Sequence, residues 1–337
     1  MIATMDVSIN RALIELAQTE PAAGDWAWNW PAKNWRQFFG LAEAHGVLGI
    51  VLDNLQRQMR HDPTAFGEHV PGLDLARRVW RAQVAKTLRI RHWSARLQTL
   101  IAAAGIPCAI LKGIDFADQL YPQPALRPTR DVDLLVPDEC WSAAERILAG
   151  AGYGKLPLRN ARKHANCGNT SWTLGAGEAI LLELHWSLVF RENLRRQMAV
   201  TMNDLDWRPT ARAGVLEPTA ATRLLLTALH GIGHQFDRLL LLCDLREACR
   251  RMVHEPDLQS LQPLLARTGT RRIVELALVV LARNLPDPSV LSLMEQIPPR
   301  ISASAAARCI SRGVILKPRG FPYLRRLMLR SWLKYAA

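Results

Sequence analysis

The chain has no long hydrophobic run. None of its apolar segments reaches the roughly 20 residues that a helix needs to cross a bilayer. The N-terminus, MIATMDVSINRALIELAQTE, also lacks the basic start and apolar block that a secretory signal would have. The sequence therefore predicts a cytoplasmic protein without a membrane span.

Cysteines are few and scattered. They form no C-x-x-C pair and no cysteine–histidine cluster at zinc spacing, and they stand at positions 108, 140, 167, 243, 249 and 309. We therefore expect reduced, mostly buried thiols rather than a zinc module.

Acidic residues are absent from the C-terminal segment. Residues 297–337 contain nine lysines and arginines and no aspartate or glutamate, so they carry most of the net charge of +13. Such a block suits nucleic acid, nucleotide phosphates or an acidic membrane surface, although a solvated basic face has the same composition. Within it, Arg326, Arg330 and Lys334 recur every four residues. This spacing predicts a basic helix face that recruits an anionic acceptor, such as RNA or a phosphorylated peptide.

Hydrophobic periodicity divides the chain into three parts. Apolar residues at three- and four-residue spacing predict helices over residues 8–104 and again from about residue 218. Between them, short apolar runs broken by turns predict a mixed sheet unit over 108–190. We therefore predict an α+β fold with three regions: N-terminal helices at 1–107, a sheet-containing core at 108–200, and C-terminal helices with a basic tail at 201–337.

Two segments make this prediction specific. WRQFFGLAEAHGVLGIVLDNLQRQ, at 35–58, has helical periodicity. SWTL and AILLELHW flank the turn GAGE and predict a hairpin.

Two aspartates open an otherwise apolar strand, DVDLLV. Side chains alternate across a strand, so Asp131 and Asp133 share one face. Because two neighbouring carboxylates repel each other and resist burial, we expect a metal ion, a basic side chain or solvent between them. In LLELHW, Glu183 and His185 share a face in the same way. Three carboxylates on neighbouring strands would form a site for a hard divalent cation.

Basic residues and a glycine surround the aspartates. The strand AIL runs into Lys112 and Gly113, and IDFADQLY predicts a short helix whose free backbone N–H groups face the same cleft. Arg127 and Arg130 precede the aspartates and add two forked cations. These residues indicate a polyphosphate site beside the acids.

The order of these motifs resembles the DNA polymerase β-like nucleotidyltransferase superfamily, which has a strand, a glycine-containing turn, a helix, an Asp-x-Asp strand and a later third acid. More closely, LKGIDFADQLYPQPALRPTRDVDLLV followed by LELHW is similar to a bacterial family of uncharacterised nucleotidyltransferases. The resemblance implies a polymerase β-like mixed sheet unit flanked by helical regions. It also implies an enzyme that moves a nucleoside monophosphate from a nucleoside triphosphate to a hydroxyl or phosphate of RNA, a modified peptide or a sugar.

The resemblance assigns metal ligands. Asp131 and Asp133 would bind two Mg²⁺ ions, and Glu183 would complete the shell of the ion that activates the attacking hydroxyl. His185 would orient the acceptor or act as a base.

The resemblance also assigns nucleotide contacts. Gly113 would let the backbone approach phosphate, and Arg127 or Arg130 would offset the charge of the leaving pyrophosphate. The superfamily usually has Gly-Ser at this turn, whereas this chain has Lys112-Gly113-Ile114. We expect Lys112 to replace the serine hydroxyl.

Other interpretations fit parts of the sequence. Arg127 and Arg130 would form ion pairs with the aspartates in a purely structural strand end. The whole unit would then be a non-catalytic nucleotide- or RNA-binding module, or a vestigial sheet in a helical docking protein. His230 and His234, four residues apart, have a zinc-compatible spacing, but the two glycines between them favour a helix end or a close helix contact.

Overall fold

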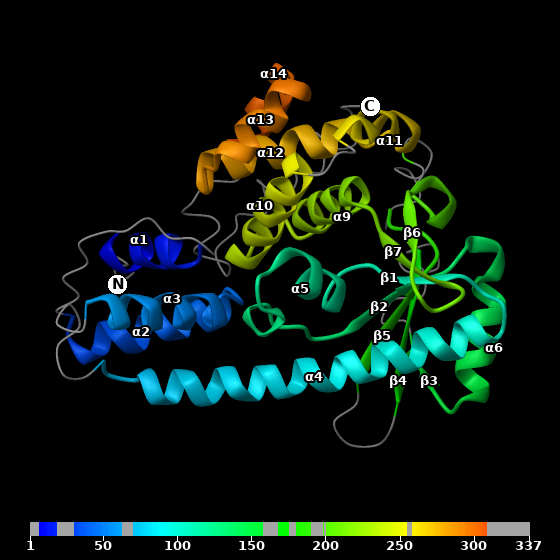
Figure 1. The fold of residues 1–337 in the computed structure, drawn as a ribbon, viewed down its shortest axis with the longest axis horizontal. Helices are drawn as coiled ribbons and strands as arrows, with labels where there is room; N and C mark the ends of the chain where they lie inside the picture. The colour runs from blue at the N-terminus through cyan, green and yellow to red at the C-terminus, as the bar shows by residue number, and fades with distance from the viewer. Residues whose placement is uncertain are drawn as a thin grey trace.

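The computed structural model describes residues 7–18, 30–62, 70–157, 168–174, 180–189, 198, 200–254 and 258–308. In these residues a seven-stranded mixed sheet lies among helices, as Figure 1 shows, so the expected α+β class is confirmed. The described helices include none with the length and apolar character required to cross a membrane. Arg326, Arg330 and Lys334 lie outside the described residues.

Four helices precede the sheet: α1 (Val7–Leu16), α2 (Ala32–Ala44), α3 (Leu48–His61) and α4 (Leu73–Ala103). The helical character expected over 35–58 is confirmed, and the segment is divided into the separate helices α2 and α3. Gly46 lies between them at φ +72°, a left-handed conformation that favours glycine. A Cβ there would lie 3.1 Å from Leu240 Cδ2, so the break also allows close packing of a later helix.

The sheet has the strand order β3-β4-β5-β2-β1-β7-β6. Its strands are β1 (Cys108–Ile110), β2 (Val132–Leu135), β3 (Gly154–Lys155), β4 (Asn169–Leu174), β5 (Ile180–His185), β6 (Trp207–Pro209) and β7 (Val215–Pro218). The antiparallel pairing of β4 and β5 confirms the expected hairpin strands. Strands β6 and β7 were not predicted, because they have only three and four residues and each contains proline.

Helices α5 (Ile114–Leu120) and α6 (Trp141–Gly150) connect the strands, as their sequences predicted. The chain then continues through helices α9 (Ala220–Gly233), α10 (Leu239–His254), α11 (Leu261–Thr268), α12 (Arg271–Asn284), α13 (Pro288–Gln296) and α14 (Ile301–Ala307).

The two faces of the sheet pack against different helices. Val132 and Leu134 of β2 belong to one apolar core with Ile90 of α4. Leu135 belongs to the other core, which contains Leu224 of α9 and much of α10. Since side chains alternate along β2, Asp133 points to the α9 and α10 side.

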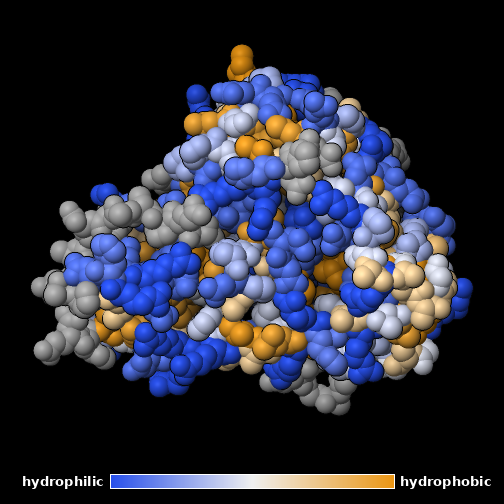
Figure 2. All heavy atoms as spheres, viewed as in Figure 1, coloured by the Kyte–Doolittle hydropathy of each residue, from blue (hydrophilic) through white to orange (hydrophobic). Residues whose placement is uncertain are grey.

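The space-filling view agrees with a core held between these layers. Hydrophilic side chains cover most of the face drawn in Figure 2, and hydrophobic ones gather in small patches. The apolar residues that would drive folding are therefore mainly inside. Because Asp133 points to the α9 and α10 side of the sheet, the candidate site lies between the sheet and these helices.

Candidate functional site

The register of β2 and β5 brings the expected acids together. These strands are parallel, and Asp133 lies directly opposite Glu183. Asp131 stands just before β2, where it is half-buried. The Lys112 ammonium lies 2.9 Å from Asp133 Oδ1, so a basic side chain provides one of the cations that the paired aspartates required.

His185 links the two opposed carboxylates. Its Nε2 lies 3.1 Å from Asp133 Oδ1 and 3.4 Å from Glu183 Oε2. A carboxylate oxygen accepts a hydrogen bond, so Nε2 carries the proton in this arrangement. Asn169 on β4 also donates to Glu183 Oε2, at 3.3 Å. His185 and Asn169 thus both contact Glu183 Oε2, although about a quarter of the Glu183 side chain is exposed.

These contacts change the acid–base properties of the site. Burial alone would raise the pKa of Asp133, but the positive charge of Lys112 and the hydrogen bond from His185 lower it. Burial and the negative charge of Asp133 raise the pKa of Asp131. Burial alone would lower the pKa of His185, but hydrogen bonds to Asp133 and Glu183 raise it. Asp133 is therefore the more firmly ionised of the two aspartates.

The same residues have a donor set for a divalent cation. Asp133, Glu183 and His185 each offer one ligand atom, and these atoms lie within 4.8 Å of one another. Asp133 Oδ2 is buried and accepts no hydrogen bond from the described residues. A buried carboxylate oxygen without a donor is unfavourable unless a cation satisfies it. The group differs from the expected trio because His185 belongs to it and Asp131 lies outside it.

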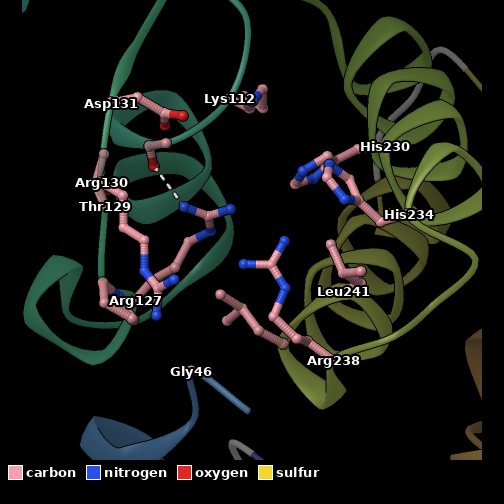
Figure 3. Close-up of a pocket in the computed structure, with 13 residues that line it drawn as sticks. Gly46, Lys112, Arg127, Thr129, Arg130, Asp131, His230, His234, Arg238 and Leu241 are labelled. Atoms are coloured by element: carbon pink, nitrogen blue, oxygen red, sulfur yellow. Dashed lines mark hydrogen bonds between the residues drawn. The ribbon is translucent and has the colours of Figure 1, made fainter. Parts of the chain in front are cut away.

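A basic pocket, defined here by Lys112, Arg127, Arg130, His234 and Arg238 among its lining residues, lies beside the acids. Figure 3 shows Lys112, Arg127 and Arg130 on the sheet side, facing His234 and Arg238, which lie in the connection between α9 and α10. Asp131 is the single acidic side chain among the described lining residues of this cavity of about 120 Å³. The excess of cations gives the pocket a positive potential suited to a polyanion.

Arg127 lies in this pocket, but its guanidinium is already engaged. Two of its nitrogens donate to Asp244 of α10, each at 2.8 Å, and a third donates to the Gly113 carbonyl at 3.1 Å. Tyr121 donates to the same carboxylate at 2.8 Å. Arg127 is only 4% exposed. Its ion pair is with Asp244, whereas the interpretation of a structural strand end expected an ion pair of Arg127 with Asp131 or Asp133. Arg127 is therefore placed to hold the backbone turn at Gly113.

A second arginine–aspartate pair supports the turn from α9. Arg223 donates to both carboxylate oxygens of Asp115, at 2.8 and 3.0 Å. Asp115 lies in the first turn of α5, the helix that begins directly after Gly113. Two forked ion pairs thus join the turn to α9 and α10.

Gly113 has a conformation and a packing environment that favour glycine. Its φ is +62°, and a Cβ would lie 2.9 Å from Thr129 Cγ2. We expect Gly113→Ala to lower the free energy of unfolding by ~2 kcal/mol more than Gly105→Ala, as measured by urea denaturation. Gly105 is a matched control, because its φ is +75° and a Cβ there would meet no atom within 4 Å. Equal losses would show that the contact with Thr129 relaxes easily.

Sequence reasoning interpreted His230 and His234 as structural, and the structure adds a place at the site. The expected helix end is present, since α9 ends at Gly233, and a Cβ on Gly231 would lie 2.3 Å from Phe236. Both histidines also line the basic pocket with Arg238. Burial and the charge of Lys112 lower the pKa of His230, so its imidazole is neutral. The glycines between the histidines were the available signal of this close approach.

Comparison with known proteins identifies a family. Residues 31–286, about three-quarters of the chain, match the model of a family described as uncharacterised nucleotidyltransferase. No curated protein matches the chain.

Proposed function

The chain belongs to the family of uncharacterised nucleotidyltransferases, and from that premise we propose that it transfers a nucleoside monophosphate from a nucleoside triphosphate to an acceptor hydroxyl. The observation that supports this reaction is that the basic pocket lies directly beside the acidic residues. Lys112 and Asp131 line the basic pocket, and the Lys112 ammonium also contacts Asp133, which lies opposite Glu183. A triphosphate held in the basic pocket would therefore present its phosphates to the acids.

We propose that Mg²⁺ is the metal at this site. Mg²⁺ prefers oxygen ligands and is commonly held by one or two carboxylates together with substrate phosphates. The buried Oδ2 of Asp133 and the carboxylate of Glu183 fit this preference, and Asp131 would add a third carboxylate. Two ions, shared by these three residues, would lower the pKa of the attacking hydroxyl and offset charge on the phosphates.

The protein groups have distinct roles in the proposed reaction. The acceptor oxygen attacks the α-phosphorus, the bond from that phosphorus to the bridging oxygen breaks, and pyrophosphate leaves. Glu183 is one-quarter exposed and would take the hydroxyl proton and pass it to solvent. His185 Nε2 donates to Asp133 and Glu183, so His185 would orient these carboxylates rather than accept a proton at that atom.

The geometry revises the proposed phosphate contacts. Arg127 is held by Asp244, so we propose that it positions the Gly113 turn. Arg130 is exposed at the pocket, and Arg238 faces it from the segment before α10 (Figure 3). These two arginines, with Lys112, would contact the triphosphate.

We expect Arg238→Ala to weaken triphosphate binding by about 10-fold or more, because it removes a charge-assisted hydrogen bond to phosphate. Titration with a fluorescent, non-hydrolysable triphosphate measures the change. Arg251→Ala is the matched control, since Arg251 is exposed on α10 and is not among the described pocket-lining residues. Equal affinities in the two variants would remove Arg238 from the nucleotide site.

Glu183→Gln tests the acceptor side. We expect it to lower turnover by at least about 100-fold while changing triphosphate affinity by less than about threefold, because Glu183 serves the attacking oxygen. Pyrophosphate release, with a deproteinised cell extract as the source of acceptor, reports turnover. A parallel loss of affinity and rate would instead place Glu183 in the nucleotide-binding shell.

A further inference from the structure

A second, larger cavity lies beyond the carboxylates. We name this cavity of about 530 Å³ the apolar chamber. It shares Lys112, Asp131, His230 and His234 with the basic pocket. Its wall includes Leu188, Val189, Met198, Leu226, Leu229 and Ile273. No phenylalanine, tyrosine or tryptophan is among the described residues that line it, and its only described rings are the imidazoles of His185, His230 and His234.

We propose that the apolar chamber binds the acceptor, and that the acceptor carries its reacting hydroxyl on an aliphatic body. This inference rests on the proposed nucleotidyl transfer and narrows its substrate class. A chamber of this volume falls in the range of small-molecule sites, which combine apolar walls with a few polar groups that fix orientation.

The position of the acids assigns the chamber to the acceptor side. Glu183 and His185 line the apolar chamber and are not among the described residues that line the basic pocket. Gly113 and Arg130 line the basic pocket and are not among those of the chamber. An acceptor in the chamber would therefore lie beside Glu183, while a triphosphate in the basic pocket would lie beside Gly113 and Arg130, so the two substrates would meet at the shared Lys112 and Asp131 from different cavities.

The chemistry of the walls favours an aliphatic body over a nucleobase or RNA. Nucleobases are commonly held by stacking on aromatic rings and by hydrogen bonds to their edges. The described lining has its charged groups and imidazoles beside the acids, and the rest of it is aliphatic with one thioether. In that part Leu226 and Ile273 are buried, and Leu188 and Leu229 are half-buried. Such walls stabilise apolar chains by removing them from water.

The reaction with such an acceptor is balanced. The alcohol oxygen forms a bond to the α-phosphorus, the bond from that phosphorus to the β-phosphate oxygen breaks, and pyrophosphate leaves with its electron pair. The alcohol proton passes to Glu183. The product is an alkyl ester of the nucleoside monophosphate.

Binding of primary alcohols from ethanol to 1-octanol tests the chamber without metal or nucleotide. We expect calorimetric titration of the full chain to show affinity rising about threefold to fourfold for each added methylene. Leu229→Trp on α9 and Leu188→Trp in the segment after β5 would each fill part of the chamber and should weaken 1-octanol binding by about 10-fold or more. Leu291→Trp is the matched control, because Leu291 is 56% exposed on α13. This variant should bind 1-octanol as the unmodified chain does.

Two results would overturn the inference: an affinity independent of chain length, or unchanged 1-octanol binding in folded Leu229→Trp and Leu188→Trp. A second arm adds Mg²⁺, α-labelled ATP and either 1-octanol or a cell extract. Labelled octyl adenylate that depends on Leu229 supports the inference. Transfer of label to an extract component at equal rates in Leu229→Trp and the unmodified chain would overturn the assignment of the chamber to the acceptor, but it would leave the proposed nucleotidyl transfer intact. Chain-length-dependent binding without transfer to any acceptor contradicts nucleotidyl transfer but supports an aliphatic ligand site.

Discussion

Replacing Asp133 with asparagine is expected to lower turnover by about 1,000-fold or more, which is ~4 kcal/mol of transition-state free energy. Asparagine preserves the shape of the side chain but removes the charge that Lys112 and His185 contact and that Mg²⁺ would require. Pyrophosphate release measures the loss.

The control for this variant is Asp138→Asn. Asp138 is exposed at the start of a short 3-10 helix, and its replacement should leave turnover unchanged. Asp131→Asn is a second test. Asp131 forms no ion pair with another described residue, so this substitution breaks none, and yet we expect a comparable loss of turnover. Near-normal turnover of Asp133→Asn in Mg²⁺ would refute the metal assignment.

Replacing Asp244 with asparagine is expected to lower the free energy of unfolding by about 3–5 kcal/mol, the largest stability effect that we predict. Asp244 is 1% exposed, and its loss of charge would leave the buried Arg127 guanidinium without its counter-ion. Urea denaturation followed by circular dichroism measures the change.

A surface pair is the control for this prediction. Arg267 and Asp206 lie 2.7 Å apart, but their side chains are 43% and 39% exposed, so Asp206→Asn should change stability by less than ~1 kcal/mol. The double variant Arg127→Met/Asp244→Leu should recover much of the stability, because it leaves no unpaired charge. It should not recover triphosphate affinity, since the hydrogen bond to the Gly113 carbonyl is also lost. A loss near that of the surface control would show that the buried pair contributes little.

The local pattern of the sequence predicted the acidic part of the site. The alternation in DVDLLV and LLELHW predicted which side chains share a face, and the register of β2 and β5 places Asp133 opposite Glu183. The resemblance to the uncharacterised nucleotidyltransferases is confirmed by the family match. Periodicity and turn residues are local properties, so a single sequence reports them well.

The rest of the site depends on distant parts of the chain. Arg127 and its partner Asp244 are 117 positions apart, and no local pattern indicates their pairing. His230 and Arg238 reach the basic pocket only because α9 and α10 pack over the sheet. The strand β7 is short and joins the sheet through β1, more than 100 positions earlier. Such contacts follow from tertiary packing, which overrides local propensity.

Transfer of label from [α-³²P]ATP and [γ-³²P]ATP is the most direct test of nucleotidyl transfer. The full chain would be incubated with Mg²⁺ and a deproteinised cell extract that supplies acceptors, beside Asp133→Asn. We predict that the α-label moves to an acceptor, that the γ-label is released as pyrophosphate, and that neither occurs with Asp133→Asn. Transfer of the γ-label to an acceptor, or equal transfer of the α-label by Asp133→Asn, would contradict the proposed reaction.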